Sequence, residues 1–295
     1  MTETIRLSTI EHGGQWWLSI TWAAEALKNA GIDVDVTRYG DGGREPLMRV
    51  ADGRSDVGIA LATGAAQAAK GIGDYKNGEA LSIRGLARLI RPNSHYFNLV
   101  RADVGIRSFA EIADKKPKLD LSASTSPYAE IVLEHYGIDL NRDIEAWGGS
   151  IQHSHPGTVQ LAVQGKCNMI MWQDTIHGPS GIVSKIAPWV MLPLDEDIAN
   201  ELEREYCAPV VTIPAGTLRG QTEPCLSVTN PGFELIINKD MPDDVAYVVA
   251  KALNESSTRR WATQDVFYTI RDAPETSAPL HPGAARYYKE QGVLT

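Results

Sequence analysis

Two hydrophobic patterns alternate along the first seventy residues. Runs of apolar and β-branched residues predict strands at 5–10, 32–37 and 56–61. Apolar residues then recur at helical spacing from Trp17 to Leu27, and further helices are expected after Pro46 and from Ala62. Three such units in succession predict a parallel α/β sheet, in which ligands bind beyond the carboxyl ends of the strands.

Apolar stretches at 86–90 and 96–100 precede a second set of alternating elements. In order, the pattern predicts a helix from Ser108, a strand from Leu119, a helix from Pro127, a strand at 143–146, a helix from Pro156 and a strand at 168–172. The rest of the chain adds a helix at 195–206, strands at 209–213 and 233–238, and a helix from Pro242. The fold class is therefore α/β.

Length, apolar content and net charge indicate a globular protein and argue against nucleic-acid binding. The chain has 295 residues, enough for one large or two medium domains, and its apolar content of 43% is that of a globular protein. A formal net charge of −9 argues against nucleic acid as a partner, because binding phosphates needs a basic face. No apolar run approaches the roughly 20 residues of a membrane span, so we expect no direct membrane insertion.

Cysteine usage and the absence of cofactor motifs limit the chemistry further. Cys167, Cys207 and Cys225 are odd in number and far apart, so we expect reduced thiols and neither a disulfide framework nor a CxxC metal site. P-loop, Rossmann and Gly-x-Ser-x-Gly patterns do not occur, and no cofactor is expected. The sequence passes from Met1 into the first strand without a basic and apolar leader, which predicts no export signal.

The loop after the first strand is the first candidate site. Gly13 and Gly14 permit tight backbone geometry and leave N–H groups at a positive helix end, where an anion can dock. Polar and aromatic residues flank the two glycines: Glu11, His12, Gln15 and Trp16. The alternative is a purely structural turn next to core tryptophans.

A hydroxyl-rich loop before the helix at Pro127 is the second candidate anion site. It contains Ser122, Ser124, Thr125 and Ser126. Hydroxyls and N–H groups at a helix start suit an anionic ligand, although simple capping of the helix by Ser126 explains the same residues.

Six segments, in order along the chain, carry a family resemblance: 13–17, 42–44, 99–106, 192–195, 212–217 and 280–294. Together they resemble the TAXI-type solute receptors, the substrate-binding subunits of tripartite (TRAP) transporters. The resemblance implies a two-lobed periplasmic-binding-protein fold of type II, with a mainly parallel, helix-flanked sheet in each lobe and a ligand cleft between them. Residues 1–95 and 215–295 would form lobe one, and 96–214 lobe two.

The implied fold gathers further candidate ligand-binding residues onto these loops: Arg44, Thr63, His155, Trp172, Asp174 and His177. Arg44 suits a carboxylate, because a guanidinium grips it through two hydrogen bonds. Trp16 and Trp172 suit an aromatic or apolar ligand body, or else belong to the core. His153 and His155 have the spacing of a metal-binding pair, but His155 before Pro156 also marks a helix boundary, and we expect no metal site.

Two functions follow. As a receptor, the protein captures a small organic acid, including aromatic carboxylates, and delivers it to a TRAP-type membrane permease; the resemblance then implies a periplasmic location. The alternative is a cytoplasmic enzyme on the same scaffold, if Met1 is the true start. It would carry out decarboxylation, isomerisation or hydration of an organic acid, with His12 and either Glu11 or Asp174 as acid and base.

Overall fold

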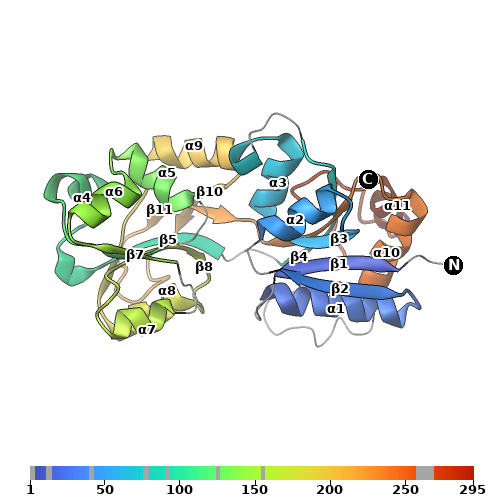
Figure 1. Cartoon of the computed structure of the whole chain (residues 1–295), viewed down its shortest axis with the longest axis horizontal. Coiled ribbons are helices and arrows are strands. Elements are labelled where there is room, and N and C mark those ends of the chain that lie inside the picture. The colour runs from blue at the N-terminus through green and yellow to red at the C-terminus, as the bar shows by residue number, and fades with distance from the viewer. Residues whose placement is uncertain are drawn as a thin grey trace. The chain divides into compact units, whose positions relative to one another are not determined.

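The computed structural model describes residues 4–10, 15–39, 43–75, 80–90, 94–123, 127–153, 157–256 and 269–295. The chain divides into two compact units, which are coloured by residue number in Figure 1. Unit 1 comprises Met1–Arg91, Glu205–Cys207 and Pro231–Thr295, and unit 2 comprises Pro92–Arg204 and Ala208–Asn230. Each unit is built on its own mixed sheet, which confirms the α/β class.

The sheet of unit 1 has five strands in the order β2-β1-β3-β12-β4. Their bounds are β1 Ile5–Ile10, β2 Val34–Tyr39, β3 Val57–Leu61, β4 Ile83–Ile90 and β12 Phe233–Asn238. Strand β1 runs parallel to β2 and β3, whereas β12 runs antiparallel to β3 and β4. A helix follows each parallel strand: α1 Gln15–Asn29, α2 Arg44–Ala51 and α3 Ala62–Lys70. The three strand–helix units predicted at the start of the chain are confirmed.

The core of unit 1 joins the start of the chain to its end. Ile20 and Leu27 of α1 are buried against the sheet, as their helical spacing predicts. Helices α10 (Asp243–Glu255) and α11 (Pro282–Glu290) complete the same core. Tyr287 and Tyr288 of α11 are fully buried, and the Tyr288 hydroxyl donates to the Leu86 carbonyl of β4 at 3.1 Å.

The sheet of unit 2 has the order β10-β11-β5-β8-β6-β7, and β9 also pairs with β5. Its strands are β5 Ser94–Arg101, β6 Asp120–Ala123, β7 Ser150–Gln152, β8 Met169–Asp174, β9 Trp189–Met191, β10 Val210–Ile213 and β11 Cys225–Asn230. Its helices are α4 Phe109–Lys115, α5 Tyr128–His135, α6 Leu140–Ala146, α7 Thr158–Val163 and α8 Pro179–Ile186, and most of α9 Glu196–Tyr206 belongs here too. Short 3-10 turns lie at Gly73–Tyr75 in unit 1 and Ala102–Val104 in unit 2.

Both units repeat one arrangement of parallel strands. The first parallel strand lies in the middle, the second on one side and the third on the other: β2-β1-β3 in unit 1 and β7-β6-β8 in unit 2. An antiparallel strand then flanks the third, β12 against β3 and β5 against β8. In each unit, therefore, three strands end at one edge of the sheet, and a helix starts after each of them.

The strand directions, one predicted strand and the domain boundaries differ from the sequence prediction. The sheets are mixed rather than mainly parallel, because long-range strands pair antiparallel with the third parallel strand of each unit. The predicted strand at 143–146 is wrong: Asp139 accepts from the Arg142 N–H at 2.8 Å and caps helix α6, whose Leu140 and Ile144 are buried four residues apart. Residues 92–95 and 215–230, assigned above to lobe one, lie in unit 2, and residues 205–207, assigned to lobe two, lie in unit 1. Residues 225–230 belong to unit 2 because they form β11, which pairs with β10 and β5.

No helix within the described part of the chain combines the length and the apolar run that crossing a membrane requires.

Candidate functional site

The carboxyl edge of the parallel strands in unit 1 brings three helix starts to one side of the sheet. Helices α1, α2 and α3 all begin there. The residues before α2 and α3, Gly43 and Leu61, provide no side-chain cap. Since the first N–H groups of a helix lack partners within it and carry partial positive charge, this edge favours an anionic group.

Arg44 is the first residue of α2 and adds a full positive charge to this edge. Its exposed guanidinium lies over the Tyr75 ring, 5.2 Å from the centroid, and Nη1 donates to the Asp74 carbonyl at 3.4 Å. Burial raises the pKa of Tyr75 to about 12, so this ring stays neutral at physiological pH. A guanidinium has five N–H donors in a planar fork, and the Asp74 contact employs one end of it. The side chain therefore suits a carboxylate.

Trp16 forms an apolar wall between the starts of α1 and α2. Its half-buried ring contacts Phe233 edge-on at a centroid distance of 4.8 Å. A Cβ atom on Gly43 would collide with the far end of this indole, so the close approach depends on glycine at the start of α2. Thr63 lies in the first turn of α3 and is buried. The structure thus brings Trp16, Arg44 and Thr63 to the same edge of unit 1.

The corresponding edge of unit 2 contains a buried hydroxyl network. Ser122 lies in β6, one residue before its end, and its hydroxyl oxygen is 2.7 Å from that of Thr158, the first residue of α7. The indole N–H of Trp172 in β8 donates to the Ser122 hydroxyl at 2.9 Å. These contacts tie β6, β8 and α7 together, so the Ser122 hydroxyl already has partners within the protein.

Asp174 ends β8, and its carboxylate serves the start of the next helix. Oδ1 accepts from the Thr175 N–H and Oδ2 from the Ser180 N–H, both at 2.8 Å. Ser180 lies in the first turn of α8, and a Cβ atom on Gly178 would displace the carboxylate. Asp174 is 5% exposed and therefore acts as an internal anion at the positive end of α8. This structural role competes with that of an acid or base for substrate.

Two histidines lie beside this edge. His177 is exposed on the loop before α8, and its backbone N–H donates to the Thr175 hydroxyl at 3.3 Å. His153 follows β7, and its Nδ1 lies 3.0 Å from the Ala123 carbonyl oxygen. Several predicted site residues fall outside the described part of the chain: Glu11, His12, Gly13, Gly14, Ser124, Thr125, Ser126, His155 and the side chain of Gln15. Two of the three residues of the enzyme hypothesis, His12 and Glu11, are among them.

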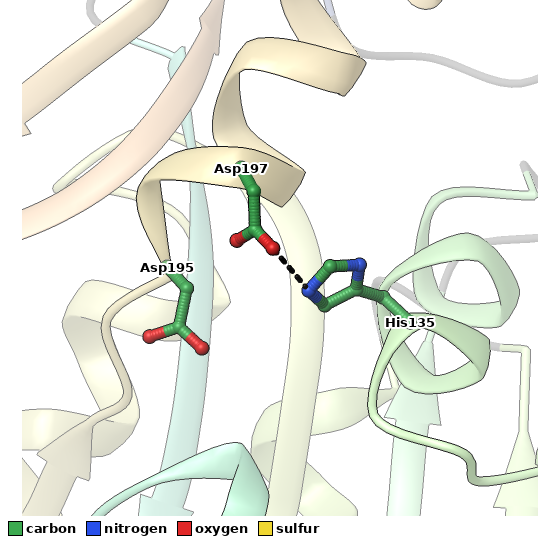
Figure 2. A group of neighbouring side chains, drawn as sticks. All are labelled: His135, Asp195 and Asp197. Carbon is green, nitrogen blue, oxygen red and sulfur yellow. Dashed lines mark ion pairs between the residues drawn. The ribbon is translucent and has the colours of Figure 1, made fainter.

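A cluster of side chains that the sequence did not predict lies on another part of unit 2. His135 ends α5, Asp195 precedes α9, and Asp197 lies in the first turn of α9. One ligand atom from each of these exposed side chains lies within 4.8 Å of the others, and His135 Nε2 is 3.4 Å from Asp197 Oδ2 (Figure 2). The only local signal is the Asp-x-Asp pair, because sixty residues separate His135 from Asp195.

The sequence profile of the NMT1-like family matches residues 12–292. Among solved structures, MatC from Rhodopseudomonas palustris with bound malate is 14% identical, with a TM-score of 0.51 over 99% of both chains. A TctC solute binding protein from Polaromonas is 15% identical, with a TM-score of 0.51 over 99% of this chain and 98% of that one. The periplasmic binding protein BugD is 12% identical, with a TM-score of 0.50 over 98% and 93%. These likenesses establish a shared periplasmic-binding-protein fold.

Proposed function

The chain belongs to the NMT1-like family, and from this premise we propose that it is a solute-binding protein that captures a small organic acid for a membrane transporter. The shared fold with MatC, a TctC protein and BugD supports a binding role. The malate bound to MatC is consistent with a carboxylate ligand for this fold. The observation that carries the proposal is the carboxyl edge of unit 1, where Arg44 stands among three helix starts.

A carboxylate satisfies the chemistry of this edge better than a neutral group does. Gly43 and Leu61 supply no side-chain cap to α2 and α3, so the partial positive charge at these helix starts favours an anionic group. A carboxylate offers several lone pairs and a negative charge, so it suits both the positive helix starts and the Arg44 fork. Trp16 then supplies an apolar surface for the body of the ligand, which favours acids with an apolar or aromatic portion.

The transporter and compartment follow from the same proposal. The ordered motifs favour a TAXI-type receptor with a TRAP-type permease as its partner, whereas the neighbouring folds include a TctC protein. The chemistry proposed for Arg44 is the same in either transport system. A periplasmic location is part of the proposal, because a receptor of this kind delivers its ligand to a permease from that side.

Calorimetry and thermal unfolding with a panel of acids test the ligand class. Malate, citrate and benzoate are compared with malamide and benzamide, which keep the body of the ligand and lack the charge. We expect at least one acid to raise the melting temperature, because a ligand that binds only the folded state stabilises it, and we expect its amide to have no effect. No stabilisation by any carboxylate would argue against the proposal.

The Arg44→Gln variant tests whether Arg44 binds the carboxylate of the ligand. It removes the charged fork from an exposed position, so we expect the fold to persist while affinity for the acid falls by about ten- to a hundredfold, or roughly 1.5–3 kcal/mol. Arg142→Gln is the matched control, since Arg142 is exposed on α6 and pairs with Asp143. Equal affinity in the parent and Arg44→Gln would contradict the assignment. Conversion of the acid during incubation would instead support the enzyme alternative.

A further inference from the structure

The His135, Asp195 and Asp197 cluster lies away from the carboxyl edge of unit 2. Helix α5 begins at that edge with Tyr128 and ends at His135, seven residues later, a rise of about 10 Å. Figure 2 shows the imidazole turned toward Asp197, with Asp195 on the preceding part of the same chain segment. The cluster is therefore separate from the Ser122, Trp172 and Asp174 contacts described above.

The spacing of the donor atoms matches that of ligands around one small cation. Zinc bonds to histidine nitrogen and carboxylate oxygen are about 2.0–2.2 Å long, so two ligands at a tetrahedral angle lie about 3.3 Å apart. His135 Nε2 and Asp197 Oδ2 are 3.4 Å apart. All three donor atoms lie within 4.8 Å of one another, so the Asp195 carboxylate is near enough to serve as a third ligand.

Neighbouring contacts hold these ligands in place. The Tyr136 hydroxyl accepts from the Asp195 backbone N–H at 3.1 Å, and the Tyr136 ring stacks on Phe109 at 5.0 Å. Asp197 Oδ1 accepts from the Ile198 N–H at 3.0 Å, which leaves Oδ2 facing the imidazole. The Tyr136 hydroxyl thus links the end of α5 to the segment before α9 through a side chain that is not itself a ligand.

An ion pair between helix ends accounts for only part of this arrangement. A histidine at the end of α5 and an aspartate at the start of α9 suit the two helix dipoles. The second carboxylate adds like-charge repulsion, which a cation between the side chains would offset. A nitrogen and two oxygens favour zinc and similar transition metals over Mg²⁺ and Ca²⁺, which prefer oxygen ligands alone.

We propose that His135 Nε2 and one carboxylate oxygen each from Asp195 and Asp197 bind a divalent transition-metal ion, Zn²⁺ being the probe of choice. Three protein ligands leave a fourth position for water. The site would join α5 to α9 within unit 2 and does not depend on the organic-acid proposal.

Zinc titration of the full chain by calorimetry, after removal of any histidine tag, tests this site. We expect one Zn²⁺ per chain and a higher melting temperature with zinc than with Mg²⁺ or Ca²⁺. His135→Gln and Asp195→Asn should each weaken zinc binding at least about tenfold, because even residues that only support metal ligands contribute that much. Asp114→Asn, at an exposed position of α4, is the control and should bind as the parent does.

Two further measurements make the outcome specific. Cu²⁺ bound to the parent should show nitrogen hyperfine splitting by electron paramagnetic resonance, and His135→Gln should lose that signal. His153→Gln should keep both properties. Circular dichroism checks that each variant is folded, which the exposure of the three ligands favours. No saturable zinc binding by the parent, unchanged binding by His135→Gln, or loss of binding in His153→Gln alone would overturn the proposal.

Discussion

At the scale of single residues, Glu234 is a titratable group in the core of unit 1. It lies in β12, fully buried, and its Oε2 accepts from the Ser277 N–H at 2.7 Å. Burial raises the pKa of Glu234 from 4.5 to about 8, against the opposing effects of that N–H and of Arg88. The side chain is therefore mostly protonated in the folded protein at neutral pH.

This pKa predicts a pH-dependent stability. A carboxyl whose pKa is higher in the folded state binds its proton more tightly there, so its stabilising contribution is complete below about pH 4.5 and is lost as pH rises to about 8. In Glu234→Gln, an uncharged amide replaces the protonated acid. We expect the melting temperature of the parent to fall more steeply than that of the variant between about pH 5 and pH 9.

Glu25→Gln, on the exposed face of α1, is the control for this experiment and should follow the parent at every pH. Parallel profiles for the parent and Glu234→Gln would show that Glu234 does not titrate as described.

At the scale of elements, local signals predicted helix starts well where the capping group is near in sequence. Ser108 accepts from the Glu111 N–H at 3.2 Å and starts α4, as the sequence analysis predicted. Helix α8 is different, because its start is served by Asp174 from the preceding strand, six residues before Ser180. Asp174, which its position in the sequence made a candidate for ligand binding or catalysis, thus has a structural role.

Asp174→Ala should destabilise the protein. Removing the carboxylate leaves the Thr175 and Ser180 N–H groups without this acceptor, so we expect the free energy of unfolding to fall by about 1–3 kcal/mol. Urea unfolding followed by circular dichroism measures the change. Asp114→Ala, at the exposed end of α4, is expected to change stability by less than about 0.5 kcal/mol. Similar midpoints for the two variants would rule out the capping role.

At the scale of the whole molecule, the two units differ in which segments of the chain form them. Unit 2 takes nearly all its residues from one continuous segment, Pro92–Asn230, with only Glu205–Cys207 assigned elsewhere. Unit 1 needs both ends of the chain, because β12 lies between β3 and β4, and Tyr287 and Tyr288 complete its core. Strand β12 is thus about 140 residues from its neighbour β4 in sequence.

Fragments 92–230 and 1–91 should therefore differ in whether they fold cooperatively by themselves. Residues 92–230 contain every strand of the unit 2 sheet, and we expect this fragment to fold and unfold cooperatively by itself. Residues 1–91 lack β12, α10 and α11, so β3 and β4 have no common neighbour and we expect no cooperative transition. Circular dichroism melts of the two fragments make the comparison. A stable 1–91 fragment, or an unfolded 92–230 fragment, would contradict this description.

Local patterns determined most of the regular elements of this protein. The spacing of hydrophobic residues predicted the first three strand–helix units. The residues that begin or end helices α4, α5 and α10 lie within a few positions of those helices, so they could be recognised in the sequence. Strand β11 was missed because polar residues occupy buried positions in it: the Ser227 hydroxyl donates to the Tyr96 carbonyl across the sheet at 2.6 Å. That partner is 131 residues away and leaves no local trace.

Tertiary structure alone decided how the elements pair and which side chains meet. Strand direction in the sheets depends on partners far apart in sequence, as when β12 separates β3 from β4. The sequence placed Trp16 and Arg44 on loops of one sheet edge, because the carboxyl ends of parallel strands coincide. The sequence could not predict that His135 lies beside Asp195, or that the Asp174 carboxylate caps the start of α8. Residue spacing along the chain indicates hydrophobic periodicity and local capping, whereas contacts between distant residues are fixed only when the sheet forms.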